Sequence, residues 1–334
     1  MVYSRTKVPV SDADLATMVR RGFGAHTAIT ECAELPDGCY NAAYRLRLDS
    51  GARLVLKVAP PPRFELLTHE VDLMRTEVHF YERAAAAGVP VPAVAYADLT
   101  RTAFERDYVF LELLTTTDLR QARGQMSTVD AAAVDHELGA AVARLHTVTG
   151  DAYGYPLRDS ATWRPSWREA FGSMVDDILA DATRLGTELP EPPDAIARRL
   201  ERHADALDAV RRPALVHFDL WDGNVFARPT GHGWRLSGLI DGERAMYADP
   251  YAEFVSLALF RDPQELPELL DGYASVTGEP VEFTEEVRTR LALYTCYLYL
   301  VMVTEGPTRE YEPSFYEPMR KQSLDLLANQ LAGL

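Results

Sequence analysis

Two short runs of alternating apolar and polar residues flank a turn early in the chain. "NAAYRLRL" precedes Asp49, Ser50 and Gly51, and "ARLVLKVA" follows them. Alternation over a short run is typical of a strand with one buried face, and an Asp-Ser-Gly turn between two such runs predicts a β-hairpin. A further strand, "YVFLEL", is expected to end near Leu114.

Helical periodicity surrounds these strands. One helical pattern begins at Ser11 and closes at "RRGFG", and another runs from about His69 to Ala87 and stops at Gly88, before the prolines of "VPVPAV". After Thr115 long helical patterns dominate, over residues 129–147, 166–185, 193–210 and from about 253 to the end, with "YTCYLYLVMV" as a buried helix. The pattern predicts an α+β chain with a boundary near residue 114, which separates a small sheet-rich lobe (1–114) from a larger, mainly helical lobe (115–334).

A polar cluster interrupts the helical half. The stretch "ALVHFDLWDGNVF", residues 214–226, places His217, Asp219 and Asn224 between apolar, strand-like runs, so the cluster is expected on a loop. Behind it, "VFAR" and "WRLSGLI" around the turn "PTGHG" predict a second hairpin. Folding this hairpin brings Asn224, before its first strand, beside Asp241, after its second.

The three oxygen-bearing side chains suggest separate roles. Asn224 and Asp241 offer an amide oxygen and a carboxylate, which suit Mg²⁺, an ion that keeps several waters and takes further ligands from phosphates. Asp219, five positions before Asn224, can face the same cleft, orient a substrate hydroxyl and accept its proton during phosphoryl transfer from ATP. Loop capping by Asx side chains is the competing interpretation.

The charge of the chain narrows the class of partner. The formal net charge of −16 argues against nucleic acid or an anionic membrane, because a phosphate surface requires a basic footprint. A cationic small molecule suits this negative charge better.

The N-terminus has no apolar signal core, and the apolar run 291–303 is too short to cross a bilayer, so we expect a cytoplasmic protein. Cys32, Cys39 and Cys296 have no paired spacing and are expected to be reduced thiols.

The central motif resembles that of the aminoglycoside phosphotransferase family, which shares the protein-kinase-like fold. The resemblance rests on His217-Phe218-Asp219, on Asn224 five residues beyond that aspartate, on Ile240-Asp241 and on "ADP" at 248–250. Phe218 departs from the family, which usually has glycine there. We expect this difference to affect local packing more than chemistry.

The resemblance extends into the small lobe and covers about residues 30–260. It implies that Lys57, on the second strand of the first hairpin, grips the nucleotide phosphates. Glu77 matches the glutamate that pairs with this lysine, and Glu70 is the competing candidate. "LPDGCYNAAY" takes the place of the nucleotide-covering loop, with Gly38 at its turn and Asn41 leading into the strand.

The same resemblance places the adenine against the main chain near Glu112 to Leu114 and makes Asp219 the catalytic residue. His217 either transfers protons or, as we favour, holds the loop through hydrogen bonds. Other polar residues keep two interpretations. Trp221 and Asp222 either contact substrate or serve packing and the turn, Asp249 can cap the following helix, and Glu243 and Glu305 either recognise ligand amines or, as we favour, lie on the solvated surface.

The implied activity is O-phosphotransfer from ATP or GTP, with Mg²⁺, to a small molecule. Two acceptor classes stay open. One is an aminoglycoside-like antibiotic, whose phosphorylation would confer antibiotic resistance, and the other is an endogenous sugar, amino alcohol or biosynthetic intermediate. A protein kinase is less well supported, because no A-P-E segment follows Asp241. The alternative from another class is a nucleotide-binding pseudokinase that acts as a scaffold.

Overall fold

An antiparallel five-stranded sheet forms the N-terminal lobe (N-lobe). The structure is a computed structural model in which residues 3–36, 38–156 and 163–334 are described. The strand order is β1-β2-β3-β5-β4, with β1 (Ile29–Glu34), β2 (Ala42–Leu48), β3 (Arg53–Val58), β4 (Val94–Asp98) and β5 (Tyr108–Glu112). The predicted hairpin is β2–β3 and the predicted "YVFLEL" strand is β5, so both are confirmed. The strands β1 and β4 were not predicted, because neither shows a regular alternation of buried and exposed positions.

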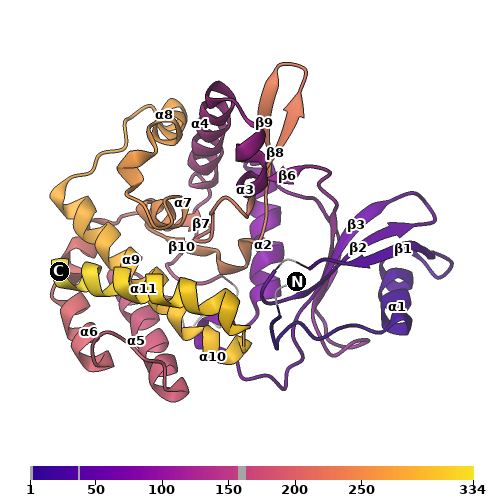
Figure 1. The fold of residues 1–334 in the computed structure, drawn as a ribbon, viewed down its shortest axis with the longest axis horizontal. Coiled ribbons are helices and arrows are strands. Elements are labelled where there is room, and N and C mark those ends of the chain that lie inside the picture. Colours follow the sequence, from indigo (N-terminus) through magenta and orange to yellow (C-terminus); the bar gives the residue numbers. More distant parts are fainter. Residues whose placement is uncertain (1–2, 37, 157–162) are drawn as a thin grey trace.

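Helices cover the two faces of this sheet. Helix α1 (Asp12–Phe23) packs Leu15, Met18 and Val19 with the inward-facing residues of β2, β3 and β5. Helix α2 (Leu73–Ala86) lies on the opposite face and joins the core of the larger lobe. Because side chains alternate along a strand, β3 directs Leu54, Leu56 and Val58 to the α1 side and Lys57 to the α2 side. Figure 1 shows α2 between the sheet and the helical lobe.

Two predicted helices are shorter than expected. The pattern from His69 to Ala87 breaks after the 3₁₀ turn η1 (Thr68–Glu70), where Asp72 is left-handed with φ of 60°, and only then does α2 begin. Likewise, α6 (Pro193–Glu201) stops before the predicted end at Val210, and a separate 3₁₀ segment, η4 (Ala204–Ala209), follows. Apolar periodicity did not distinguish these breaks from continuous helix, since buried residues lie on both sides of each.

The C-terminal lobe (C-lobe) is built around a helix that is buried on nearly every side. This helix, α9 (Glu285–Thr304), contains the "YTCYLYLVMV" run and confirms that prediction. Predicted helices 129–147 and 166–185 are α4 and α5, each begun by a capping serine. The α-helices described in this lobe are α3 (Leu119–Ala122), α4 (Thr128–Leu145), α5 (Trp167–Leu185), α6, α7 (Glu253–Leu257), α8 (Pro267–Thr277), α9, α10 (Gly306–Arg309) and α11 (Pro313–Gly333).

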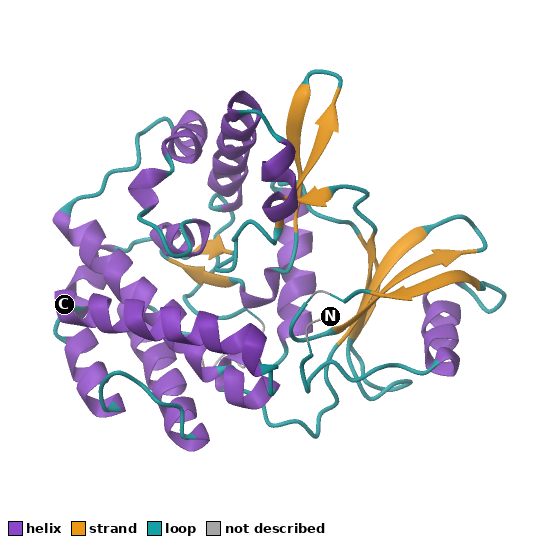
Figure 2. Cartoon of the chain, in the orientation of Figure 1, coloured by secondary structure: helices purple, strands orange, loops and turns teal. Residues whose placement is uncertain are grey.

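Two small sheets inside the C-lobe hold the polar cluster (Figure 2). Strand β7 (Ala214–Val216) pairs antiparallel with β10 (Met246–Ala248). Strands β8 (Val225–Thr230) and β9 (Gly233–Leu239) form the predicted second hairpin, and β6 (Thr117–Asp118) pairs with β8. The loop from 217 to 224 therefore runs between two anchored strands.

The two-lobed α+β architecture agrees with the predicted protein-kinase-like fold. The predicted division at residues 114 and 115 falls between β5 and β6 and stays a prediction. Among the described residues, none of the helices has the length and apolar character that a membrane crossing requires. Cys32, Cys39 and Cys296 are all free cysteines.

Candidate active site

Lys57 lies where the two lobes meet. Its ammonium donates to Glu77 Oε1 of α2 at 2.5 Å and also pairs with the carboxylate of Asp241 in the C-lobe. Burial alone would lower the pKa of Lys57, but the carboxylates of Asp241 and Glu77 outweigh it and hold that pKa well above its ordinary value. Of the two candidate partners, Lys57 pairs with Glu77. Glu70 pairs instead with Arg309.

A tyrosine links α2 to the Asp241 backbone. The hydroxyl of Tyr81 donates to Glu77 Oε1 at 2.8 Å, and it accepts the main-chain N–H of Asp241 at 3.1 Å. Asp241 is left-handed, with φ of 62°, so its amide turns toward this hydroxyl. Sequence reasoning missed Tyr81, although its position one helical turn after Glu77 was visible.

The second hairpin brings Asn224 and Asp241 together, as its folding predicted. Val225 faces Leu239 across the two strands, and Ile240 N–H donates to the carbonyl of Asn224 at 2.9 Å. The amide nitrogen of Asn224 donates to the main-chain oxygen of Asp219 at 2.8 Å and to its carboxylate at 3.2 Å. One side-chain amide therefore joins Asp219 to the hairpin.

A buried glutamate, Glu253, holds the backbone of the loop that contains Asp219. Glu253, at the start of α7, accepts the main-chain N–H of His217 at 2.7 Å and that of Phe218 at 2.9 Å. Ser256 Oγ accepts the N–H of Leu220 at 3.0 Å. These contacts fix the loop backbone on both sides of Asp219. Glu253 was not predicted to have a role. The sequence signal that could have indicated one is its position three residues after "ADP".

His217 is fully buried and both of its ring nitrogens are engaged. Nδ1 lies 3.2 Å from the N–H of Asp219, and Nε2 lies 2.8 Å from the carbonyl of Ile240. These partners require an acceptor at Nδ1 and a donor at Nε2, which is the neutral ring. Burial also lowers the pKa of His217. The imidazole thus connects the Asp219 loop to the residue before Asp241.

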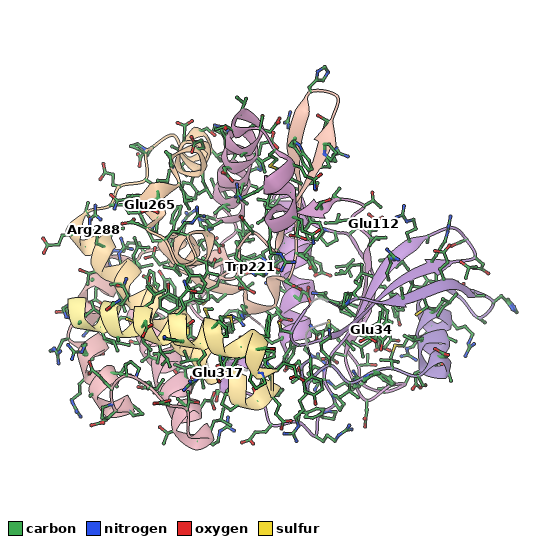
Figure 3. All side chains as sticks on the ribbon, in the orientation of Figure 1. Glu34, Glu112, Trp221, Glu265, Arg288 and Glu317 are labelled. Carbon is green, nitrogen blue, oxygen red and sulfur yellow. The ribbon has the colours of Figure 1, made fainter. Side chains whose placement is uncertain are left out.

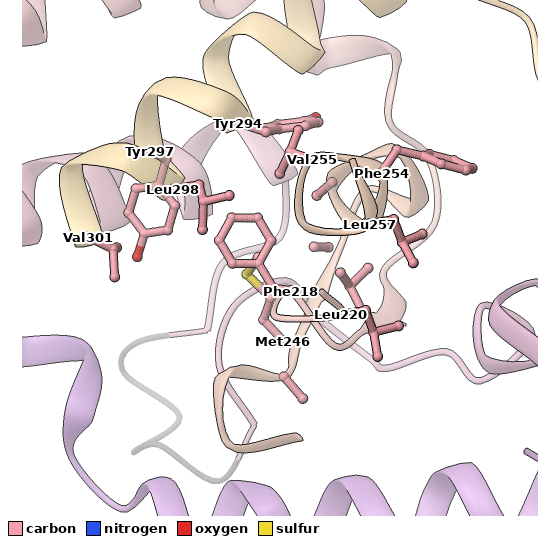
Figure 4. Close-up of a cluster of buried hydrophobic side chains, with 14 of the residues drawn as sticks. Phe218, Leu220, Met246, Phe254, Val255, Leu257, Tyr294, Tyr297, Leu298 and Val301 are labelled. Atoms are coloured by element: carbon pink, nitrogen blue, oxygen red, sulfur yellow. The ribbon is translucent and has the colours of Figure 1, made fainter. Parts of the chain in front are cut away.

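Phe218 anchors this loop in the hydrophobic core. The residue is left-handed, with φ of 63°, and its side chain is buried. Its ring lies 5.9 Å from that of Tyr297 on α9, and Figure 4 shows it among Met246, Leu298 and Val301. Burial of the aromatic ring offsets the conformational cost of the left-handed backbone at this residue. The structure shows how Phe218 packs, and the smaller effect expected on chemistry stays a prediction.

Burial and neighbouring charges shift the pKa values of Asp219 and Glu243. Burial raises the pKa of Asp219 to about 7, Arg244 opposes this, and Asp241 and Glu305 add to it. Burial, followed by the charge of Asp241, raises the pKa of Glu243 to about 8. Such shifts are common where carboxylates serve a reaction.

Arg244, in the C-lobe, is a positive charge that acts on Asp219 and pairs with Glu305. Arg244 donates to Glu305 Oε2 at 2.7 Å and lowers the pKa of Asp219. Glu305 is only 6% exposed, so its favoured placement on the solvated surface was wrong. Glu243 is half-buried and accepts from the Asn41 amide at 2.9 Å. The sequence favoured surface positions for both glutamates because their partners, Asn41 and Arg244, are not indicated by any local pattern.

The predicted nucleotide-covering loop reaches the C-lobe through Asn41. Gly38 has φ of 92°, which favours glycine, and nothing would meet an added Cβ there. Glu112, the last residue of β5, is exposed (Figure 3), and Leu114 packs against Gly238 of β9. The predicted adenine contact at Glu112 to Leu114 stays a prediction.

The donor set fits Mg²⁺. With the Asn224 nitrogen directed at Asp219, the amide oxygen is left as a donor, and the Asp241 side chain is 31% exposed. An amide oxygen and a carboxylate oxygen are ligands that Mg²⁺ accepts when phosphates and water supply the others. The described residues contain no group of three His, Cys, Asp or Glu with metal-binding geometry.

Trp221 and Asp222 of the loop, and Asp249 near it, have structural partners. Asp222 forms a two-oxygen pair with Arg123 at 2.6 and 2.9 Å, and the indole of Trp221 lies over Gly223 with Arg120 on its ring. Asp249 caps the turn that begins at Pro250, as expected, and also accepts from Tyr294 at 2.7 Å. Packing and turn roles are thus visible for Trp221 and Asp222.

Known proteins share both the sequence pattern and the fold. The phosphotransferase enzyme family (APH) matches residues 31–293. A Klebsiella aerogenes protein named "Probable ketoamine kinase" is 24% identical over 282 residues, which is 80% of this chain and 84% of that protein. The structure of a "putative fructosamine-3-kinase" from Thermobifida fusca is 22% identical, has a TM-score of 0.65, and covers 96% of this chain and 100% of that one. The gentamicin complex of APH(2")-IIa is 15% identical, with a TM-score of 0.61 and 98% of each chain covered.

Proposed function

This chain belongs to the phosphotransferase enzyme family, and from that premise we propose that it transfers the γ-phosphoryl group of ATP or GTP to a hydroxyl of a small molecule. The observation that carries the proposal is that Lys57 pairs with Asp241 across the two lobes and that the Asn224 amide joins Asp219 to the same hairpin. These residues come from β3, the 217–224 loop and the end of the β8–β9 hairpin.

Lys57 and the metal-binding pair would handle the nucleotide. Lys57, oriented by Glu77, would hold the phosphates as a fixed positive charge, since its raised pKa keeps it protonated. Asn224 and Asp241 would hold Mg²⁺, which when bound neutralises charge on the phosphates. In the free protein Lys57 pairs with Asp241, so nucleotide binding would exchange this contact for contacts to phosphate.

Asp219 would act on the acceptor hydroxyl. A carboxylate with a pKa near 7 can accept a proton at neutral pH more readily than an ordinary aspartate. His217, neutral and buried, would hold the loop as a positioning residue. Most of the acceleration is expected from placement and charge stabilisation, because phosphoryl transfer asks little covalent chemistry of the protein.

The acceptor we propose is a ketoamine, a sugar joined to an amine. It combines hydroxyls for Asp219 with a cationic amine that suits a chain of net charge −16. The relatives named as ketoamine kinases support this endogenous class over an antibiotic.

The test measures phosphorylated product over a panel of ketoamines, aminoglycosides, amino alcohols and free sugars, with Mg²⁺ and either ATP or GTP. We expect product from a ketoamine, and loss of about 10²–10⁴-fold in kcat in D219N with nucleotide binding retained. Product from an aminoglycoside alone would transfer the assignment to the antibiotic class. Nucleotide binding without turnover on any acceptor would support the pseudokinase scaffold.

A further inference from the structure

One buried arginine reaches the candidate active site from outside the family match. Arg309 ends the short helix α10, sixteen positions beyond residue 293, and is 3% exposed. The described N-terminal segment meets it there, since Arg5 N–H donates to the carbonyl of Arg309 at 2.8 Å. A corner of the C-lobe thus forms from parts of the chain that the family does not cover.

The guanidinium of Arg309 faces the nucleotide-covering loop. Its Nη1 donates to the main-chain oxygen of Cys39 at 3.0 Å, and its Nη2 pairs with the buried Glu70. The guanidinium carbon lies 4.5 Å from the centre of the Tyr40 ring. The hydroxyl of Tyr40 donates in turn to the carbonyl of Glu70 at 3.4 Å. Two consecutive loop residues are therefore held by one side chain of the C-lobe.

This loop segment lies beside the phosphate-binding lysine. It leads directly into β2, where Ala43 is the cross-strand partner of Lys57. Asn41, the next residue after Tyr40, donates to Glu243, two positions beyond Asp241. The segment Cys39 to Asn41 is thus tied to the C-lobe on both sides, by Arg309 and by Glu243.

The anchor of Arg309 is rigid. Glu305, one helical turn earlier, lies 3.5 Å from Arg309 and also pairs with Arg244. Gly306 begins α10 where an added Cβ would lie 2.2 Å from the Tyr316 ring of α11, so the corner is closely packed. A loop fixed to such a corner loses freedom in the absence of ligand.

We propose that Arg309 is a positioning residue that clasps Cys39 and Tyr40 of the nucleotide-covering loop against the C-lobe and slows the release of nucleotide. The inference rests on the proposed function, because it assigns the loop to nucleotide binding. A loop already held in its bound position costs less ordering on binding, and closed loops act mainly on dissociation rates. The clasp thus raises affinity without contacting the reacting atoms.

Two variants weaken the clasp in different ways. R309K keeps a positive charge for Glu70 but lacks the second donor that reaches Cys39. The double variant E70Q/R309M removes both charges together, so that neither is left buried and unpaired. E310Q is the matched control, since Glu310 forms an exposed ion pair with Arg5 at the next position.

The experiment measures dissociation of a fluorescent ATP analogue with Mg²⁺ and, separately, thiol labelling of Cys39 in a C32S background. Cys32 is exposed and Cys296 is buried, so labelling then reports the loop. In R309K and in the double variant we expect dissociation and labelling about tenfold faster, the factor that corresponds to about 1.4 kcal/mol. The KM for nucleotide should rise while kcat does not fall, and E310Q should match the parent.

The failures of the two proposals are distinguishable. If the parent binds nucleotide and the folded double variant keeps parental dissociation and labelling rates, the clasp is wrong and the proposed function stands. Tighter nucleotide binding in the variants would also overturn the clasp, because the contact would then be inhibitory. A parent that binds no nucleotide overturns both.

Discussion

Asp219 illustrates the conflict between chemistry and stability at a single residue. Its carboxylate is half-buried and must ionise to accept a proton, and burial raises its pKa to about 7. The nearby Arg244 limits the shift without cancelling it. We therefore expect Asp219 to be partly protonated near neutral pH in the free protein.

The pH dependence of the reaction should report this carboxylate. Because only ionised Asp219 can accept the proton, kcat/KM of the parent is expected to fall about tenfold per unit below pH 7 and to level off above it. Initial rates between pH 5.5 and 8.5, with acceptor and nucleotide far below saturation, provide the check. A flat profile across that range would remove Asp219 from proton transfer.

The same pKa makes a prediction about stability. A carboxyl whose folded pKa lies above its unfolded value of about 3.9 costs stability once it must ionise, and this cost grows as the pH rises toward 7. We expect D219N to melt at a higher temperature than the parent at pH 8, with a smaller gain at pH 5. Thermal unfolding at both pH values is the measurement, and an equal difference at both would contradict the assigned burial.

Phe218 combines a strained backbone with a buried ring. Removing the ring is expected to cost about 3–5 kcal/mol in F218A. F218G should lose the same contacts but cost about 1 kcal/mol less, since glycine accepts a φ of 63° without the left-handed penalty. Denaturant unfolding compares the two variants. Greater stability of F218A would mean that the loop backbone relaxes once the ring is gone.

At the scale of elements, the site depends on α2 and the β8–β9 hairpin being joined. Tyr81 makes this connection, because one hydroxyl serves both Glu77 of α2 and the Asp241 main chain. Glu253 of α7 performs a similar task beneath the 217–224 loop. Three separate elements thus hold residues that must agree within a fraction of an ångström to act together.

Y81F removes the hydroxyl and keeps the ring. Loss of a hydrogen bond to a charged group is worth about 1.5–3 kcal/mol, so we expect the affinity for Mg²⁺ and nucleotide to fall about tenfold or more. Calorimetric titration of nucleotide with Mg²⁺ measures it. Y44F is the control, since the Tyr44 hydroxyl accepts the main-chain N–H of Val10, in the N-terminal segment. Equal affinities in Y81F and the parent would show that α2 and the hairpin are placed independently.

Local patterns predicted the elements better than their ends. The alternation around Asp49 to Gly51 was sufficient to place Lys57 on its strand, and the hairpin after Asn224 was sufficient to place Asp241 just beyond the end of β9. The break at Asp72 was not visible, since a left-handed aspartate leaves no mark on apolar periodicity. The exposed strand β1 has no alternation to detect, and tertiary pairing alone makes it a strand.

At the scale of the whole molecule, the cleft draws on regions that no motif marks. The sequence identified Lys57, Asp219, Asn224 and Asp241 because their spacing carries the resemblance. It favoured a surface position for Glu305 and did not identify Arg309, because their partners Arg244, Glu70 and Cys39 lie between 61 and 270 positions away. Long-range ion pairs of this kind depend on how the lobes assemble.

The central claim is that these converging side chains transfer a phosphoryl group. The most direct test is ³¹P NMR detection of the phosphoester formed from a ketoamine and ATP with Mg²⁺, in the parent, in D219N and in D208N. Asp208 is an exposed partner of Arg168 and controls for the loss of one carboxylate. We predict a phosphoester with the parent and D208N, and none above background with D219N although it binds nucleotide. Phosphoester formation by D219N at the parental rate would contradict the claim.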